Sequence, residues 1–171
     1  GRPKPSPIVR LFSFLIDKDQ IKVTIDNGTS QYEIKSASSK EFNLNSIKKP
    51  SAPNFEDATE KLTDVPLIRV AYGRSGDKGN KANIGIIARD PKFYPAICNF
   101  LDEKVVKDCF SNFLEGSVER YFLPGSNSLN FILNDVLGGG GPASLRNDPQ
   151  GKAYAQILLD QTIPIPAKLI D

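Results

Sequence analysis

The 171-residue sequence contains no histidine, no methionine and no tryptophan. Without histidine, the chain cannot hold a Ser-His-Asp or Cys-His nucleophile system, a zinc site built on histidine, or a haem bound through histidine. The two cysteines, Cys98 and Cys109, are too few for a disulfide scaffold or a four-thiolate cluster. Any chemistry must therefore use Asp, Glu, Lys, Arg, Ser, Tyr or backbone amides, and we expect no metal site.

The chain also lacks a large excess of either charge and lacks long apolar runs. Lys and Arg number 22 against 20 Asp and Glu, so the net charge of +2 lacks the basic excess typical of nucleic-acid or anionic-membrane binders. No apolar run approaches the roughly 20 residues of a membrane span, and no signal-peptide pattern precedes the longest run. We therefore expect a cytoplasmic protein with neither a nucleic-acid nor a membrane partner.

The first 64 residues differ in texture from the rest, and we expect them to belong to a longer protein because position 1 is not methionine. Three stretches are typical of strands, namely residues 8–16, 20–25 and 31–35. Asn27 and Gly28 lie between the last two stretches and predict a hairpin turn. Residues 36–64 are polar and rich in Ser and Pro, which predicts a linker with at most a short helix at residues 55–62.

From residue 65 onward, the patterns predict a folded domain. We expect strands at residues 67–72, 84–88, 118–123, 129–133 and 163–170. Pro95 and Asp102 open two helices after residue 88, and Asp148 with Pro149 opens a third. The order from residue 84 is strand, split helix, strand, strand, helix, strand. This is the split βαβ arrangement of an α+β, ferredoxin-like two-layer sandwich, with residues 67–72 as an added strand.

Between the first two strands of this domain, residues 73–83 predict a glycine-rich polar loop. Its backbone amides can turn toward an anion. Residues 69–89 contain five basic side chains and one acidic side chain, that of Asp77. We expect the following residues to bind a ligand: Arg74, Ser75, Gly76, Lys78, Gly79, Asn80, Lys81 and Asn83. Asp77 is the candidate catalytic acid or base. The alternative is a hairpin loop with solvated lysines and a salt-bridged Asp77.

Four consecutive glycines at positions 138–141 form a second candidate segment. Such a run is costly to order, so an ordered run indicates backbone that passes close to a ligand or a partner strand. The residues that we expect to contribute ligand contacts here are Gly139, Gly140, Gly141, Ser144, Arg146 and Lys152. The alternative is a turn that packing alone requires.

These segments resemble a known family. The runs RSGDKGNKANIGIIAR (residues 74–89) and LGGGGPASLRNDPQGK (residues 137–152) resemble the two hallmark runs of the acyclic terpene utilisation (AtuA) proteins, and EGSVERYFLPGSNSLNFIL between them resembles the middle stretch. The opening GRPKPSPIVRLFSF is similar to the end of the family's large N-terminal domain. The resemblance implies the tail of that domain at residues 1–35, a linker at 36–64 and a ferredoxin-like C-terminal domain at 65–171.

The resemblance also implies a role in the catabolism of acyclic terpenes and branched acids that are handled as acyl-CoA thioesters. We expect the domain to bind an anionic small molecule such as an acyl-CoA, with the CoA thioester as substrate, and to have the large N-terminal domain and further copies of itself as partners. The alternative is a non-catalytic module for oligomerisation or interdomain assembly. RNA binding, which this fold often serves, is disfavoured by the near-zero net charge.

Overall fold

The computed structural model describes residues 1–34, 43–55 and 61–170. The chain divides into two compact units. One consists of Gly1–Arg10 together with Lys49–Asp171, and the other of Leu11–Lys48. The helix predicted at residues 55–62 lies largely outside the described residues, as does part of the predicted linker.

The smaller unit contains one hairpin, formed by β1 (Val23–Asp26) and β2 (Gln31–Ile34). The side-chain oxygen of Asn27 accepts hydrogen bonds from the amides of Thr29 and Ser30, which closes the turn. The hairpin predicted from Asn27 and Gly28 is therefore confirmed. The strand predicted at residues 8–16 is wrong, because that segment pairs with no strand in the described part of the chain. Its apolar pattern lacked a partner strand with which to form a ladder.

The larger unit is built on a four-stranded sheet in the order β4-β5-β7-β6. Its strands are β4 (Ala71–Lys78), β5 (Lys81–Ala88), β6 (Val118–Leu123) and β7 (Ser128–Leu133). Each neighbouring pair is antiparallel, so β5 and β6 run parallel with β7 between them. Two helices, α1 (Tyr94–Phe100) and α2 (Glu103–Cys109), connect β5 to β6. This is the predicted split βαβ arrangement, and it confirms an α+β, ferredoxin-like fold.

The last strand takes a different place from the one expected of a ferredoxin-like sheet. β8 (Thr162–Pro166) pairs with β3 (Leu62–Pro66) in a separate two-stranded sheet, and β4 occupies the edge of the main sheet beside β5. Pro164 and Pro166 have no amide hydrogen to donate, which suits a strand with a single neighbour. The predicted strand at residues 163–170 therefore ends at Pro166, and a 3-10 turn follows at Ala167–Leu169.

The loop predicted at residues 73–83 is wrong, because these residues form most of a β-hairpin. β4 continues to Lys78, a tight turn uses Gly79 and Asn80, and β5 begins at Lys81. The strand predicted at residues 67–72 is displaced, since Leu67–Arg69 is a 3-10 turn. Small and polar side chains along β4 hid the two-residue alternation of a strand, whereas the glycines suggested a loop.

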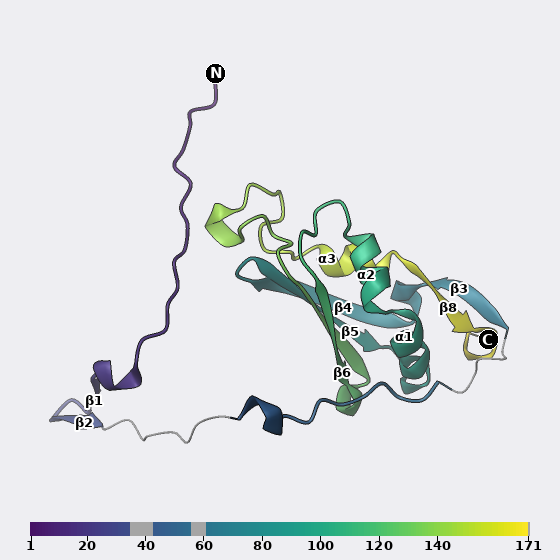
Figure 1. Cartoon of the computed structure of the whole chain (residues 1–171), viewed down its shortest axis with the longest axis horizontal. Coiled ribbons are helices and arrows are strands. Elements are labelled where there is room, and N and C mark those ends of the chain that lie inside the picture. The colour runs from purple at the N-terminus through teal and green to yellow at the C-terminus, as the bar shows by residue number, and fades with distance from the viewer. Residues whose placement is uncertain (35–42, 56–60, 171) are drawn as a thin grey trace. The chain divides into compact units, whose positions relative to one another are not determined.

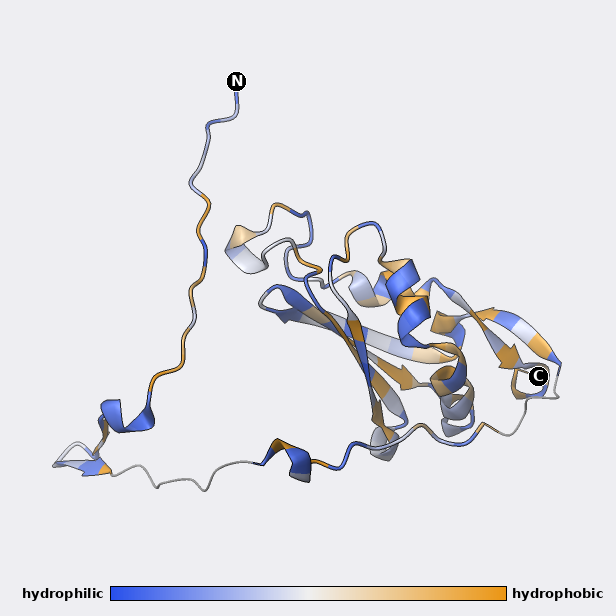
Figure 2. Cartoon of the chain, viewed as in Figure 1, coloured by the Kyte–Doolittle hydropathy of each residue, from blue (hydrophilic) through white to orange (hydrophobic). Residues whose placement is uncertain are grey.

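The core lies between the sheet and the helices α1, α2 and α3 (Tyr154–Leu159), which cover one face of the sheet (Figure 1). Alternate strand residues point into this layer, and polar and apolar residues alternate along the strands in Figure 2. The buried set includes Ala82, Ile84, Ile86, Leu129, Phe131 and Leu133. Asp102 accepts a hydrogen bond from the amide of Val105 and so begins α2, as predicted. None of the helices in the described ranges is long and apolar enough to span a membrane.

Candidate functional site

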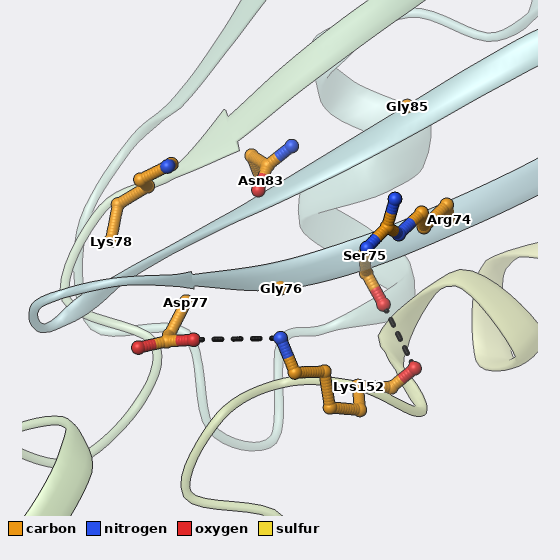
Figure 3. Close-up of a pocket in the computed structure, with 8 residues that line it drawn as sticks. All are labelled: Arg74, Ser75, Gly76, Asp77, Lys78, Asn83, Gly85 and Lys152. Carbon is orange, nitrogen blue, oxygen red and sulfur yellow. Dashed lines mark hydrogen bonds and ion pairs between the residues drawn. The ribbon is translucent and has the colours of Figure 1, made fainter.

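A cavity of about 380 Å³ lies along the β4–β5 hairpin (Figure 3). The residues that line it are Arg74, Ser75, Gly76, Asp77, Lys78, Asn83, Gly85 and Lys152. All except Gly85 are residues that the sequence predicted for ligand binding or catalysis. The structure thus brings most of the first predicted segment together with Lys152, which comes from the second.

Two glycines leave space beside the hairpin backbone at this cavity. A Cβ atom at Gly76 would lie 3.0 Å from the Lys152 ammonium nitrogen and 3.9 Å from the Asn83 side-chain oxygen. The bare backbone of Gly76 therefore leaves room for these two polar groups. A Cβ atom at Gly85 would meet only the Arg74 carbonyl, at 3.7 Å, so Gly85 leaves open space on β5. A glycine in the interior of a strand often marks such a close approach, and this signal in residues 84–88 could have identified Gly85.

Lys152 reaches the cavity because its backbone is held in place. The Ser75 hydroxyl donates to the Lys152 carbonyl (3.1 Å) and accepts from the Ala155 amide (2.9 Å). The Asp148 carboxylate accepts from the amides of Lys152 (3.0 Å) and Ala153 (2.8 Å). Asp148 was predicted to begin a helix at Pro149, but α3 begins at Tyr154. Asp148 instead fixes the turn that precedes the helix.

The ammonium group of Lys152 lies 3.6 Å from the Asp77 carboxylate, and Figure 3 shows the two side chains pointing toward each other. Arg74 and Lys78 are exposed, and neither side chain has an ion pair or a hydrogen bond with any described residue. Three cations thus face one carboxylate around the cavity. The two cations without a partner in the described part of the chain, Arg74 and Lys78, are therefore available to attract an anion.

The glycine run contacts the turn between β4 and β5, although none of its four residues lines the cavity. The Asn80 side-chain oxygen accepts from the Gly139 amide (2.7 Å), and the Asn80 carbonyl accepts from the amide of Val136 (3.1 Å). Gly140 packs directly against the backbone of Gly79, where a side chain has no room. The close approach that Gly140 permits is therefore a contact with the chain's own hairpin turn.

Several predicted residues lie outside the cavity lining. Arg146 donates to the Phe113 carbonyl (3.0 Å), and its guanidinium lies 5.2 Å from the centre of the Phe113 ring. The Ser144 hydroxyl accepts from the Arg146 amide (3.2 Å). The other predicted residues that do not line the cavity are Gly79, Asn80, Lys81, Gly139, Gly140 and Gly141. The structure engages Arg146 and Ser144 with the protein itself.

Metal-ligating side chains do not cluster in the described part of the chain, and both of its thiols have raised pKa values. Among the described residues, no three His, Cys, Asp or Glu side chains gather to hold a metal ion. The two cysteines are free. Burial raises the pKa of the Cys98 thiol to about 11, and burial also raises the pKa of Cys109. Both therefore stay protonated near neutral pH, and neither is an activated nucleophile.

Comparison with known protein families finds a match over this domain. The model of the AtuA ferredoxin-like domain family matches residues 65–164, a range that contains every residue of the cavity. No curated protein and no solved structure matches the chain. The match confirms the resemblance drawn from the two glycine-containing segments.

Proposed function

The chain belongs to the AtuA family through its ferredoxin-like domain at residues 65–164, and from this premise we propose that the domain binds an anionic small molecule in the cavity beside β4. An acyl-CoA is the ligand that we propose within this class. The corresponding role is in the catabolism of acyclic terpenes or branched acids, which the family resemblance implies.

The observation that carries this proposal is the placement of Arg74, Lys78 and Lys152 around the bare backbone of Gly76 and Gly85. A CoA thioester carries several phosphate charges, and guanidinium and ammonium groups bind phosphate by charge-assisted hydrogen bonds. The glycines let phosphate oxygens approach the strands without a side chain between them. A carboxylate-rich or purely apolar cavity would not favour such a ligand.

Asp77 has a defined place in this proposal. Among the described residues it is the only carboxylate that lines the cavity, and its ion pair orients the Lys152 ammonium. It is therefore the group that we propose for proton transfer, if the bound molecule reacts here. Lys152 balances its charge beside the incoming anion.

Isothermal titration with CoA tests the anion site directly. We expect the variant Arg74→Ala/Lys78→Ala to bind CoA at least tenfold more weakly, since each side chain contributes a charge-assisted contact of about 1.5–3 kcal/mol. The control is Arg69→Ala/Lys107→Ala, which removes the same charge from exposed residues outside the cavity. Equal CoA affinity in both double variants, or no binding by the unaltered chain, would overturn the proposal.

A second candidate function, assembly with another domain or another copy, is favoured by the β1–β2 hairpin. Val23, Ile25, Tyr32 and Ile34 share one face of this hairpin, and all four side chains are exposed. An isolated two-stranded hairpin is marginally stable in water, so a partner that covers this face would stabilise it. Light scattering over a range of chain concentrations tests this function, and a monomer at every concentration would contradict self-assembly.

A further inference from the structure

The face of the main sheet that lies away from the helices changes in character from one end to the other. Strand alternation and register give three rows across this face. The rows are Tyr72, Ile87, Ser128 and Leu123; then Arg74, Gly85, Asn130 and Tyr121; then Gly76, Asn83, Ile132 and Glu119. Lys78 and Lys81 follow at the hairpin end.

Apolar surface lies at the end opposite the lysines. Tyr72, Ile87 and Leu123 are 55%, 48% and 45% exposed, although all three are large apolar side chains. Lys78 lies six positions after Tyr72 along β4, a span of about 20 Å at the rise of a β-strand. One continuous face therefore carries Arg74, Lys78 and Lys81, together with the Glu119 carboxylate, toward the hairpin end and exposed apolar groups at the other end.

The middle of this face offers a path between the two ends. Gly85 lies opposite Arg74 and between Asn83 and Ile87 on this face of β5, and it has no side chain to obstruct the strand. The apolar end is also pre-organised. The Arg89 guanidinium lies 3.8 Å from the centre of the Tyr72 ring, and its Nε donates to the Ile68 carbonyl (2.8 Å). Arg89 thereby holds the Tyr72 ring in place on the sheet.

We propose that this face binds the acyl chain of an amphiphilic anion, with the phosphate-bearing head in the cavity and the chain extending over Gly85 toward Tyr72, Ile87 and Leu123. This inference rests on the proposed function, because the cations select the head group. The occupant follows from charge complementarity at the hairpin end and from the continuity of the cavity with the apolar row. Covering these side chains removes apolar surface from water, which favours a longer chain over a shorter one.

The experiment compares CoA, butyryl-CoA and octanoyl-CoA by isothermal titration. A methylene that is fully buried strengthens binding up to about fourfold, and chains on an open face are only partly covered. We therefore expect the affinity for octanoyl-CoA to exceed the affinity for CoA by about tenfold or more. The variant Ile87→Asn/Leu123→Asn should lose this gain and keep the affinity for CoA. Ile157→Asn, at an exposed isoleucine of α3, is the control that should retain the gain.

Gly85→Val is a second variant that leaves the fold intact. Its Cβ atom would make only ordinary contact, at 3.7 Å from the Arg74 carbonyl, and β-branched residues suit a strand. Because Gly85 also lines the anion cavity, we expect this variant to bind CoA itself more weakly and to bind octanoyl-CoA no more tightly than CoA, with a melting temperature within a few degrees of the unaltered chain.

The outcomes separate this inference from the proposed function. If the unaltered chain binds CoA and octanoyl-CoA equally, or if both variants keep the full gain, the acyl-chain surface is wrong while the anion site stands. If CoA, butyryl-CoA and octanoyl-CoA all fail to bind, the proposed function fails and the acyl-chain surface fails with it. A gain that disappears in both variants and persists in Ile157→Asn supports the inference.

Discussion

The hydroxyl of Ser75, buried in β4, donates a hydrogen bond to the carbonyl of Lys152, which lies 77 residues further along the chain. The same hydroxyl accepts from the Ala155 amide at the beginning of α3. This contact joins the edge strand of the sheet to the turn that supplies the third cation of the cavity. The site is therefore assembled by tertiary structure and not by one contiguous loop.

Replacing Ser75 with alanine should affect both stability and ligand binding. The buried Ala155 amide would lose its acceptor, and a buried donor without a partner costs about 1–3 kcal/mol. Lys152 would lose a backbone anchor, so CoA should also bind more weakly. Denaturant unfolding and isothermal titration measure the two effects. Ser111→Ala, at an exposed position, is the matched control. Unchanged stability in Ser75→Ala would show that this hydrogen bond contributes nothing.

The sequence predicted the parts of this domain that depend on local patterns. Val118 to Leu123 form the predicted strand with the predicted bounds, and the Asp102 cap lies where its sequence signal indicated. These elements have strong periodicity or a specific capping residue. The fold class followed because the order of such elements is characteristic of a split βαβ arrangement.

The parts that the sequence did not predict depend on distant contacts. The pairing of β8 with β3 involves strands about 100 residues apart, and neither pattern indicates the partner. Likewise, Arg146 and Lys152 are equally plausible anion ligands in the sequence. Only the fold directs Lys152 to Gly76 and Arg146 to Phe113. The position of a side chain in the fold, rather than its residue type, therefore decides which predicted residues line the cavity.

The two glycines Gly140 and Gly141 should respond very differently to alanine. Both have positive φ angles, +73° and +48°, which cost an alanine roughly 1–2 kcal/mol at Gly141 and about 1–3 kcal/mol at Gly140, whose ψ of 153° places it in a region essentially restricted to glycine. At Gly141 no atom lies within 4 Å of the added Cβ, so this conformational cost is the whole effect. At Gly140 the Cβ would overlap the backbone of Gly79 and force the hairpin turn away.

We therefore expect Gly140→Ala to be destabilised by about 1–3 kcal/mol more than Gly141→Ala, since an overpacked contact adds a cost of this size. Chemical denaturation of the two variants measures the difference. Equal midpoints would show that the glycine run does not need its close approach to Gly79.

Stability should fall at alkaline pH because of the buried thiol of Cys98. Burial raises the pKa of Cys98 from 9.0 to about 11, so the folded protein binds this proton more tightly than the unfolded chain does. The contribution is complete below pH 9 and is lost as the pH rises to about 11. Burial also raises the pKa of the neighbouring Tyr94, which acts in the same direction at higher pH.

Guanidinium unfolding from pH 7 to pH 10.5 measures this dependence. We expect Cys98→Ala to lose less stability than the unaltered chain over that interval. Cys109→Ala should change the slope in the same direction, because burial also raises the pKa of the partly buried Cys109. Identical slopes for the unaltered chain and Cys98→Ala would contradict the assigned cause.

Alanine variants of Arg146 and Lys78 should distinguish a residue that stabilises the fold from one that binds the ligand. Arg146→Ala removes a hydrogen bond to the Phe113 carbonyl and a cation–π contact with the same ring, which together contribute about 1–2 kcal/mol. It should therefore lower the free energy of unfolding and leave CoA affinity unchanged. Lys78→Ala should do the reverse, because Lys78 is exposed at the cavity and no described residue forms an ion pair with it. Unfolding and titration on the same two variants test both halves. Loss of CoA binding in Arg146→Ala, with stability preserved, would mean that this arginine leaves Phe113 to contact the ligand.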